Sequence, residues 1–497
     1  MERSSGILLP VYALPSPYGI GALGQAALDF VDFLASAGQT WWQMLPIGPT
    51  SYGDSPYQSP SSYAGNPYFI DLDTLIAEGL LTKAEVDAID WGNDSAHVDY
   101  AGLYEKRPAL LRRAFERGWE RDGANVERFR AANSSWLDDY ALFMALKRHF
   151  GMACWTEWPD EAIRLHKSEA IERYRKLLAS EVHFNEYVQF LFYKQWERLH
   201  DYAREKGVRL MGDMPIYVAL DSADVWADAD QFMLDERNLP TEVAGVPPDA
   251  FTSDGQLWGN PLYDYEAMEA DGFSWWIRRV AGAAQLFDMV RIDHFRGFES
   301  FWAVPAGAES AWNGRWAKGP GMKLVGVLQN RFPQLSLVAE DLGYATPEVA
   351  ALLADSGLPG MKVLEFAFDY REASSIAHMP HNYTSNCVCY VGTHDNATIM
   401  QWRDEADAQD VSHAIRYLGL NEREGFAWGF IRGGMESVAV LFVAQMQDYL
   451  ELGADARTNT PGTSGCNWRW RMISGQATPD LADRIMAVTE LYGRNTR

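Results

Sequence analysis

Short hydrophobic runs alternate with longer amphipathic segments along the whole chain. The runs are rich in Val, Ile, Leu and Tyr and are bounded by Gly, Pro, Asn or Asp, as buried parallel strands are. About eight such runs occur, at residues 6–14, 40–47, 207–218, 289–293, 337–341, 361–369, 387–395 and 439–452. Apolar residues at helical spacing lie between most of them, for example over residues 26–38. This pattern predicts an α/β fold, and eight alternating units favour a (β/α)8 TIM barrel.

Two long segments interrupt the alternation of strands and helices. Residues 50–206 begin as a loop rich in Ser, Pro, Gly and Tyr and continue as a helical block. Residues 219–285 contain many Pro, Gly and Asp residues and have little periodicity over 219–272. Ordered loops of this length are usually lids or binding elements. We therefore expect one catalytic barrel over residues 1–497, with large subdomains inserted after its early strands and the second acting as a loop-rich cover of the active site.

Three of the strand-like runs carry an acid at their C-terminal end: Asp293, Glu340 and Asp395. The C-terminal ends of barrel strands meet at one mouth, so the three carboxylates would converge on one pocket. Two carboxylates facing one bond are the arrangement that glycosidic-bond chemistry needs. Arg291 lies two residues before Asp293 and favours its ionised form, which a nucleophile requires. Glu340 follows apolar residues and precedes Asp341, so we expect a raised pKa and a proton donor.

Each of these acids also has a purely structural interpretation. An Arg–Asp pair can close a strand, a Glu–Asp pair can cap a helix, and an Asp–Asn pair can form an Asx turn. For a single residue the structural interpretation is the stronger one. However, Asp213 ends a further strand-like run, and four acids at strand ends of one chain favour a common site. Asp395 and the neighbouring His394 could bind sugar hydroxyl groups, and Asp213 could contact Arg291 or bind the substrate.

Aromatic residues are unusually frequent, with 19 Trp, 23 Tyr and 23 Phe. Their flat faces can stack on the apolar faces of sugar rings. Many lie beside turn residues, namely Trp41, Trp42, Tyr52, Tyr57, Trp258, Trp275, Trp276, Trp312 and Trp316. Core packing is the better explanation for any single Trp, but the clustering in loops favours a carbohydrate-binding cleft.

Charge and composition exclude several classes of partner. The chain has 43 basic and 68 acidic residues and a net charge of −25, which argues against nucleic acid or anionic membranes and suits a neutral substrate. No apolar run approaches the roughly 18 residues of a membrane span, and the N-terminal residues lack the apolar stretch of a secretory signal. The four cysteines form no CxxC pair. We therefore expect a cytoplasmic protein.

One motif points towards nucleotide chemistry. Residues 19–24 match GxGxxG, the dinucleotide fingerprint. The loop that contains them is long and rich in Pro, and the next strand-like run has no acid to bind a ribose, so a nucleotide role is not expected. His378 and His381 lie in a polar loop without a matching set of ligands, so no metal site is expected either.

Several motifs follow one another in a specific order: PSPYGIG (15–21), WWQMLPIGPT (41–50), SYGDSPYQS (51–59), AGNPYFIDL (64–72), GDMPIYV (212–218), LWGNPLYDY (257–265), RIDHFRG (291–297), VAEDLG (338–343), GMKVLEFAFD (360–369), GTHDN (392–396), and NTPGT with NWRWR within 459–471. In these motifs, which span nearly the whole chain, the sequence resembles the 4-α-glucanotransferases of glycoside hydrolase family 77. These enzymes, also called amylomaltases or disproportionating enzymes, belong to the α-amylase clan.

The resemblance implies roles for individual residues. Asp293 would be the nucleophile, Glu340 the general acid/base and Asp395 the stabiliser of the transition state. Substrate-binding positions would be Tyr57, Asp213, Trp258, Arg291, His294, Asp369, His394 and Asn459. The resemblance also implies a neutral residue such as Gln at position 365, where this chain has Glu365.

The implied activity is transfer of α-1,4-glucan segments to the 4-hydroxyl group of an acceptor glucan or glucose. It proceeds with retention through a covalent glycosyl-enzyme and without a cofactor or metal, so the expected partners are α-1,4-glucans and maltooligosaccharides. A hydrolase of the same clan is the main alternative. A non-catalytic glucan-binding protein would be expected to have lost one of the three acids, and all three are present.

Overall fold

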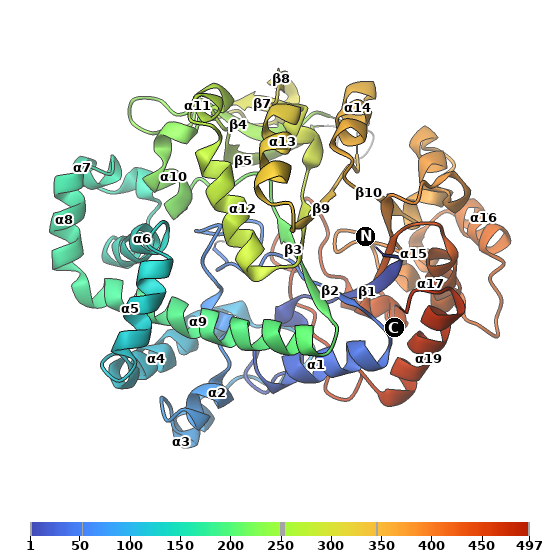
Figure 1. The fold of residues 1–497 in the computed structure, drawn as a ribbon, viewed down its shortest axis with the longest axis horizontal. Coiled ribbons are helices and arrows are strands. Elements are labelled where there is room, and N and C mark those ends of the chain that lie inside the picture. Colours follow the sequence, from blue (N-terminus) through green and yellow to red (C-terminus); the bar gives the residue numbers. More distant parts are fainter. Residues whose placement is uncertain (1, 52, 249–253, 344–345, 496–497) are drawn as a thin grey trace.

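The structure is a computed structural model that describes residues 2–51, 53–248, 254–343 and 346–495. At its centre lies an eight-stranded sheet with the strand order β10-β11-β12-β1-β2-β3-β6-β9 (Figure 1). These strands are β1 (Ser4–Leu8), β2 (Trp41–Gln43), β3 (Arg209–Met214), β6 (Met289–Ile292), β9 (Ser336–Ala339), β10 (Gly360–Val363), β11 (Cys387–Tyr390) and β12 (Leu441–Gln445). All paired neighbours in this sheet are parallel.

The sheet closes on itself. The first strand pairs with the last, with Ser4 opposite Leu441. The remaining junction of the barrel lies between β9 and β10, where the N–H of Ala339 at the end of β9 donates a 2.9 Å hydrogen bond to the carbonyl of Pro359, just before β10. A separate cluster of buried side chains, contributed by all eight strands, lies on the face opposite the helices, as expected for a barrel interior. The predicted TIM barrel is therefore confirmed.

A helical block lies between β2 and β3 and extends to the left of the barrel in Figure 1. Its helices are α2 (Leu72–Ala77), α3 (Lys83–Asp87), α4 (Tyr100–Gly118), α5 (Gly123–Ala132), α6 (Leu137–His149), α7 (Glu161–Arg164), α8 (Ser168–Leu177) and α9 (Ala179–Glu205). Helix α9 is 27 residues long and packs against α4, α5, α6 and α8 as well as against β3. It therefore joins the helical block to the barrel.

A second, antiparallel sheet has the order β5-β4-β7-β8 and lies at the top of Figure 1. Strands β4 (Glu242–Val246) and β5 (Gln256–Pro261) precede β6, whereas β7 (Ser300–Pro305) and β8 (Arg315–Lys318) follow it. The sequence pattern did not predict this sheet. Its strands are short, three of the four contain Gly or Pro, and several have both faces partly exposed, so neither a buried run nor a regular alternation marks them.

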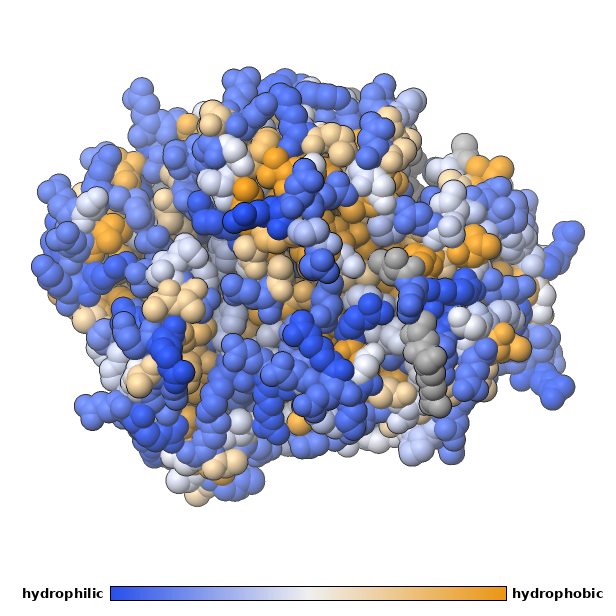
Figure 2. All heavy atoms as spheres, in the orientation of Figure 1, coloured by the Kyte–Doolittle hydropathy of each residue, from blue (hydrophilic) through white to orange (hydrophobic). Residues whose placement is uncertain are grey.

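The remaining helices cover the barrel and the second sheet. They are α1 (Gln25–Ser36), α10 (Ala223–Ala227), α11 (Tyr265–Ala270), α12 (Ser274–Leu286), α13 (Met322–Arg331), α14 (Pro347–Ser356), α15 (Ile399–Glu405), α16 (Ala408–Leu418), α17 (Phe426–Glu436), α18 (Met446–Tyr449) and α19 (Pro479–Leu491). Within the described part of the chain, no helix combines the length and the apolar character needed to cross a membrane. Hydrophilic side chains dominate the face shown in Figure 2.

The structure divides the aromatic residues into two groups. Trp41, Trp42, Trp275 and Trp276 are at most 1% exposed, so their assignment to a binding cleft was wrong and they belong to the core. Strand β2 places Trp41 inside the barrel, whereas Trp42 packs against the surrounding helices. Tyr57 and Trp258 are only partly buried, and Trp312 and Trp316 are exposed. Tyr52 lies outside the described residues.

Candidate active site

Three adjacent barrel strands bring three acids to the same rim. Asp213 lies near the end of β3, Asp293 directly follows β6, and Glu340 directly follows β9. The parallel pairing continues past the strand ends, because the N–H of Asp293 donates to the carbonyl of Met214 and the N–H of Glu340 to that of Ile292, each at 3.0 Å. The predicted convergence of Asp293 and Glu340 therefore follows from strand register.

Arg291 connects two of these carboxylates. Its Nη2 lies 2.9 Å from Oδ1 of Asp293 and 3.1 Å from Oδ2 of Asp213, and the side chain is almost fully buried. Burial raises the pKa of Asp293 to about 6, and the charge of Arg291 opposes that rise. Asp293 is thus mainly ionised at neutral pH, as a nucleophile requires, but its pKa lies above the ordinary value and not below it.

Glu340 has the properties of a proton donor. Its Oε2 accepts a 2.8 Å hydrogen bond from the N–H of His294. Burial raises its pKa to about 8, and the negative charge of Asp293 adds to the rise. The sequence interpretation attributed the second contribution to Asp341, but that carboxylate turns away and accepts a 2.6 Å hydrogen bond from the N–H of Met361. The predicted direction is confirmed, with a different neighbouring acid as its cause.

His294 follows Asp293 in the sequence and contacts both Glu340 and Trp258. Its backbone is left-handed, with φ 50°, and this turn directs its N–H towards Glu340. Its ring contacts Trp258 edge to face, with centroids 4.8 Å apart, and Trp258 comes from β5 of the second sheet. Burial lowers the pKa of His294 to about 3, so its ring is uncharged at neutral pH.

Asp395 lies in the turn after β11 and is held from two sides. Nε2 of His394 is 3.2 Å from its Oδ2, and Nδ2 of Asn459 donates a 2.6 Å hydrogen bond to its Oδ1. Desolvation opposes ionisation, but these two neighbours hold the pKa of Asp395 well below its usual range. Asp395 is therefore a permanent negative charge that accepts hydrogen bonds.

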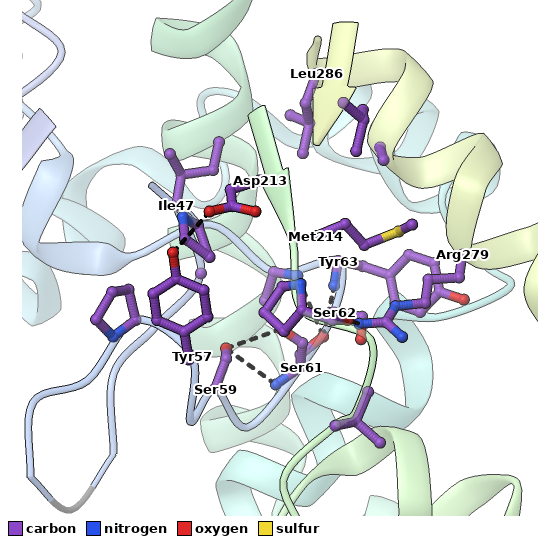
Figure 3. Close-up of a pocket in the computed structure, with 18 of the residues that line it drawn as sticks. Ile47, Tyr57, Ser59, Ser61, Ser62, Tyr63, Asp213, Met214, Arg279 and Leu286 are labelled. Atoms are coloured by element: carbon purple, nitrogen blue, oxygen red, sulfur yellow. Dashed lines mark hydrogen bonds between the residues drawn. The ribbon is translucent and has the colours of Figure 1, made fainter. Parts of the chain in front are cut away.

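Tyr57 connects Asp213, on one side of the site, to His394, which lies beside Asp395 on the other side. Its hydroxyl donates a 2.6 Å hydrogen bond to Oδ2 of Asp213 and lies 2.8 Å from Nε2 of His394. Its ring stacks on His394 at 5.3 Å and also packs near Trp468. Figure 3 shows the Tyr57 hydroxyl directed at Asp213, with a small cavity beside them.

That cavity, of about 70 Å³, lies between the Tyr57 loop, the end of β3 and helix α12. A space of this size holds a few water molecules. Asp293, Glu340 and Asp395 are not among the residues that line this cavity. The side chains of Asp293 and Asp395 are instead 29% and 45% exposed.

The structure does not bring every predicted residue into this network. The Asp369 carboxylate pairs with Arg371 at 2.8 Å and is not joined by a hydrogen bond to the described residues around Asp293, Glu340 and Asp395. Conversely, the sequence did not assign Arg457, whose Nη2 donates a 2.9 Å hydrogen bond to the carbonyl of Asp395, or Trp468, which packs near His394. Both residues lie near Asn459 in the sequence, and this closeness could have indicated that they belong to the site. Among the described residues, no group of three His, Cys, Asp or Glu side chains is arranged to hold a metal ion.

Comparison with known proteins agrees with this geometry. Residues 9–476 match the family described as 4-alpha-glucanotransferase, glycoside hydrolase family 77. The chain is 46% identical to a 4-alpha-glucanotransferase of Streptococcus pneumoniae over 99% of this chain and 98% of that protein. It is also 46% identical to one of Thermus thermophilus, over 99% of each chain. The solved amylomaltase from Streptococcus agalactiae in complex with acarbose superposes with a TM-score of 0.97 at 39% identity, covering 100% of both chains. The chain belongs to glycoside hydrolase family 77, the 4-α-glucanotransferases.

Proposed function

We propose that this protein transfers segments of α-1,4-glucans to the 4-hydroxyl group of an acceptor glucan or of glucose, with retention of the α linkage. The observation that carries the proposal is the difference between two neighbouring carboxyl groups. Glu340 has a pKa of about 8 and keeps its proton at neutral pH, whereas Asp293 has a pKa of about 6 and loses it. Membership of family 77 supports α-1,4-glucans as the substrate.

The first step forms a covalent glycosyl-enzyme. A carboxylate oxygen of Asp293 attacks the anomeric carbon while Glu340 gives its proton to the leaving O4, and the C1–O4 bond breaks. The N–H of His294 orients Glu340 through its 2.8 Å hydrogen bond. The permanent charge of Asp395 stabilises the positive charge that develops on the sugar ring and binds its hydroxyl groups.

The second step transfers the glycosyl group from Asp293 to the acceptor and regenerates the free enzyme. The acceptor 4-hydroxyl attacks the anomeric carbon, its proton passes to the now ionised Glu340, and the bond to Asp293 breaks. Two inversions at one carbon restore the α configuration. Asp293 and Glu340 supply both the nucleophile and the proton transfers, so the proposal requires no metal or cofactor.

Transfer requires an acceptor sugar to compete successfully with water. Tyr57 and Trp258 are partly exposed and place aromatic rings against His394 and His294, next to the acids. Such rings can bind a sugar face while excluding solvent. The four cysteines are free thiols, with Cys387 and Cys389 buried, which supports a reducing cytoplasm as the location.

Product analysis with maltotriose as the sole substrate tests the proposal. A transferase forms glucose together with maltopentaose and longer oligosaccharides while the number of reducing ends stays constant. A hydrolase forms glucose and maltose while the number of reducing ends rises, and a binding protein leaves maltotriose unchanged. A steady rise of reducing ends without longer products would contradict the transfer proposal.

A further inference from the structure

Glu365 is a buried acid that the mechanism above does not use. It begins the short helix η7 (Glu365–Phe368) immediately after β10, and only 5% of the residue is exposed. Its N–H donates a 3.2 Å hydrogen bond to the carbonyl of Val391, at the end of β11. Within the described chain, its Oε1 is fully buried and finds no hydrogen-bond partner. A polar atom in that condition needs an explanation.

The Glu365 carboxyl group lies against the turn that carries Asp395. A methyl group built on Gly392 would lie 2.5 Å from Oε1 of Glu365, which is closer than real contacts allow. With the Glu365 side chain in this position, only glycine leaves room for the carboxyl group at position 392. Gly392 begins the turn, and the N–H of Asp395 is bonded within the same turn to Oγ1 of Thr393 at 3.3 Å. Glu365 therefore occupies the space that determines how close the turn approaches β10.

The electrostatic surroundings favour a neutral Glu365. Burial raises its pKa well above the ordinary value, and the nearby Asp448 of α18 raises it further, whereas Arg457 opposes the rise. Asp448 is fully buried, and one of its carboxylate oxygens also lacks a partner. Arg457 donates instead to the carbonyls of Asp395 (2.9 Å) and Asn459 (2.8 Å). An unpaired buried acid retains its proton, because ionisation without a partner is costly.

We propose that Glu365 is a positioning residue for Asp395 and acts as a neutral carboxylic acid. Its carboxyl group packs against Gly392 and fixes the turn that presents Asp395. Because it is uncharged, it leaves Arg457 bound to the backbone carbonyls of Asp395 and Asn459. An ionised Glu365 would attract Arg457 and draw it away from those carbonyls. The inference rests on the proposed role of Asp395 in transfer.

The test measures kcat and KM for maltotriose disproportionation, together with the thermal unfolding midpoint, in four variants: E365Q, E365A, G392A and the double variant G392A/E365A. E365Q keeps the shape without a charge and should stay within about twofold of the parent kcat. E365A and G392A should each lower kcat about tenfold or more with little change in KM, because they displace a transition-state group. The double variant should have a higher kcat than G392A, since the new methyl group then fits the space left by the carboxyl group.

Glu186 provides a matched control. It is 1% exposed, its Oε2 has no partner among the described residues, and its other oxygen lies 3.0 Å from Arg130 on the helical block. Burial raises its pKa to about 7. E186A should lower the unfolding midpoint without lowering kcat. An equal loss of kcat in E186A would show that any lost buried acid impairs the enzyme, and would overturn the positioning role.

Other outcomes also decide the question. If kcat is as low in E365Q as in E365A, the claim that Glu365 acts as a neutral acid is wrong. If kcat is normal in E365A, or if the two substitutions have strictly additive effects in the double variant, the claim that Glu365 positions Asp395 is wrong. If E365A does not fold, G392A alone decides the question. A kcat of G392A equal to that of the parent would then show that the contact between Gly392 and Glu365 does not position Asp395. D395N separates this inference from the mechanism: turnover retained in D395N contradicts the proposed function, whereas its loss beside a normal E365A contradicts only the role of Glu365.

Discussion

The N–H of His294 donates a 2.8 Å hydrogen bond to Oε2 of Glu340 and so connects the residue after Asp293, the proposed nucleophile, to the proposed acid/base. The left-handed backbone of His294 makes this contact possible. Because the same residue also follows Asp293, this hydrogen bond ties the position of the Glu340 carboxyl group to the chain segment that carries Asp293. Pre-positioning of this kind places catalytic groups within the small tolerance that transfer chemistry requires.

Replacing Asp293 with Asn removes the nucleophile and keeps its size. We expect transfer to fall at least ~10⁴-fold while glucan affinity changes little, because the amide cannot form the glycosyl-enzyme. Maltotriose disproportionation and calorimetric titration with a long maltooligosaccharide measure the two quantities. The exposed Asp87 of α3 serves as the control, and D87N should retain full activity. Substantial turnover in D293N would remove Asp293 from the mechanism.

The activity should depend on pH as a bell-shaped curve. Below about pH 6, protonation of Asp293 removes the nucleophile, and above about pH 8, ionisation of Glu340 removes the proton donor. Initial rates of kcat/KM for maltotriose between pH 4 and pH 10 would trace both limbs. A curve that remained flat up to pH 10 would contradict the assignment of Glu340 as the acid.

Glu340 should also make the fold less stable as the pH rises. Its pKa is about 8 in the folded protein and ordinarily 4.5, so the native state holds a proton that the unfolded state has lost between these values. The free energy of unfolding should therefore fall between pH 5 and pH 8, and E340Q should reduce that fall. Urea unfolding of both proteins at several pH values measures the difference. Parallel curves for the two proteins would show that folding does not raise the pKa of Glu340.

Removing the Tyr57 hydroxyl should break the connection between Asp213 and His394. In Y57F, Asp213 loses its 2.6 Å hydrogen bond and His394 loses a neighbour at 2.8 Å. We expect kcat/KM to fall about tenfold and the free energy of unfolding to fall by about 1–2 kcal/mol. Y202F is the matched control, because that hydroxyl binds Asp32 at 2.8 Å, outside the set of residues that forms the site. Equal losses of activity in both variants would contradict a specific role for Tyr57.

The sequence predicted the barrel and its three acids because strands buried on both faces form short, recognisable apolar runs. Strands β4, β5, β7 and β8 were not recognised, since their pairing joins segments on both sides of β6 and leaves no local pattern. Arg457 was missed for the same reason, because its contact with Asp395 depends on how two distant loops fold together. Asp341 shows the opposite case, because adjacency to Glu340 along the chain did not place the two carboxylates together.

The pairing of β1 with β12 has a consequence for synthesis of the protein. The first strand needs both β2 and residues around Leu441 as neighbours, so one of its edges stays open until the ribosome has made nearly the whole chain. At typical elongation rates this interval lasts on the order of tens of seconds. An exposed strand edge during that time is a site for aggregation. We therefore expect production of the folded enzyme to respond to elongation speed and to chaperones that shield the nascent N-terminal half.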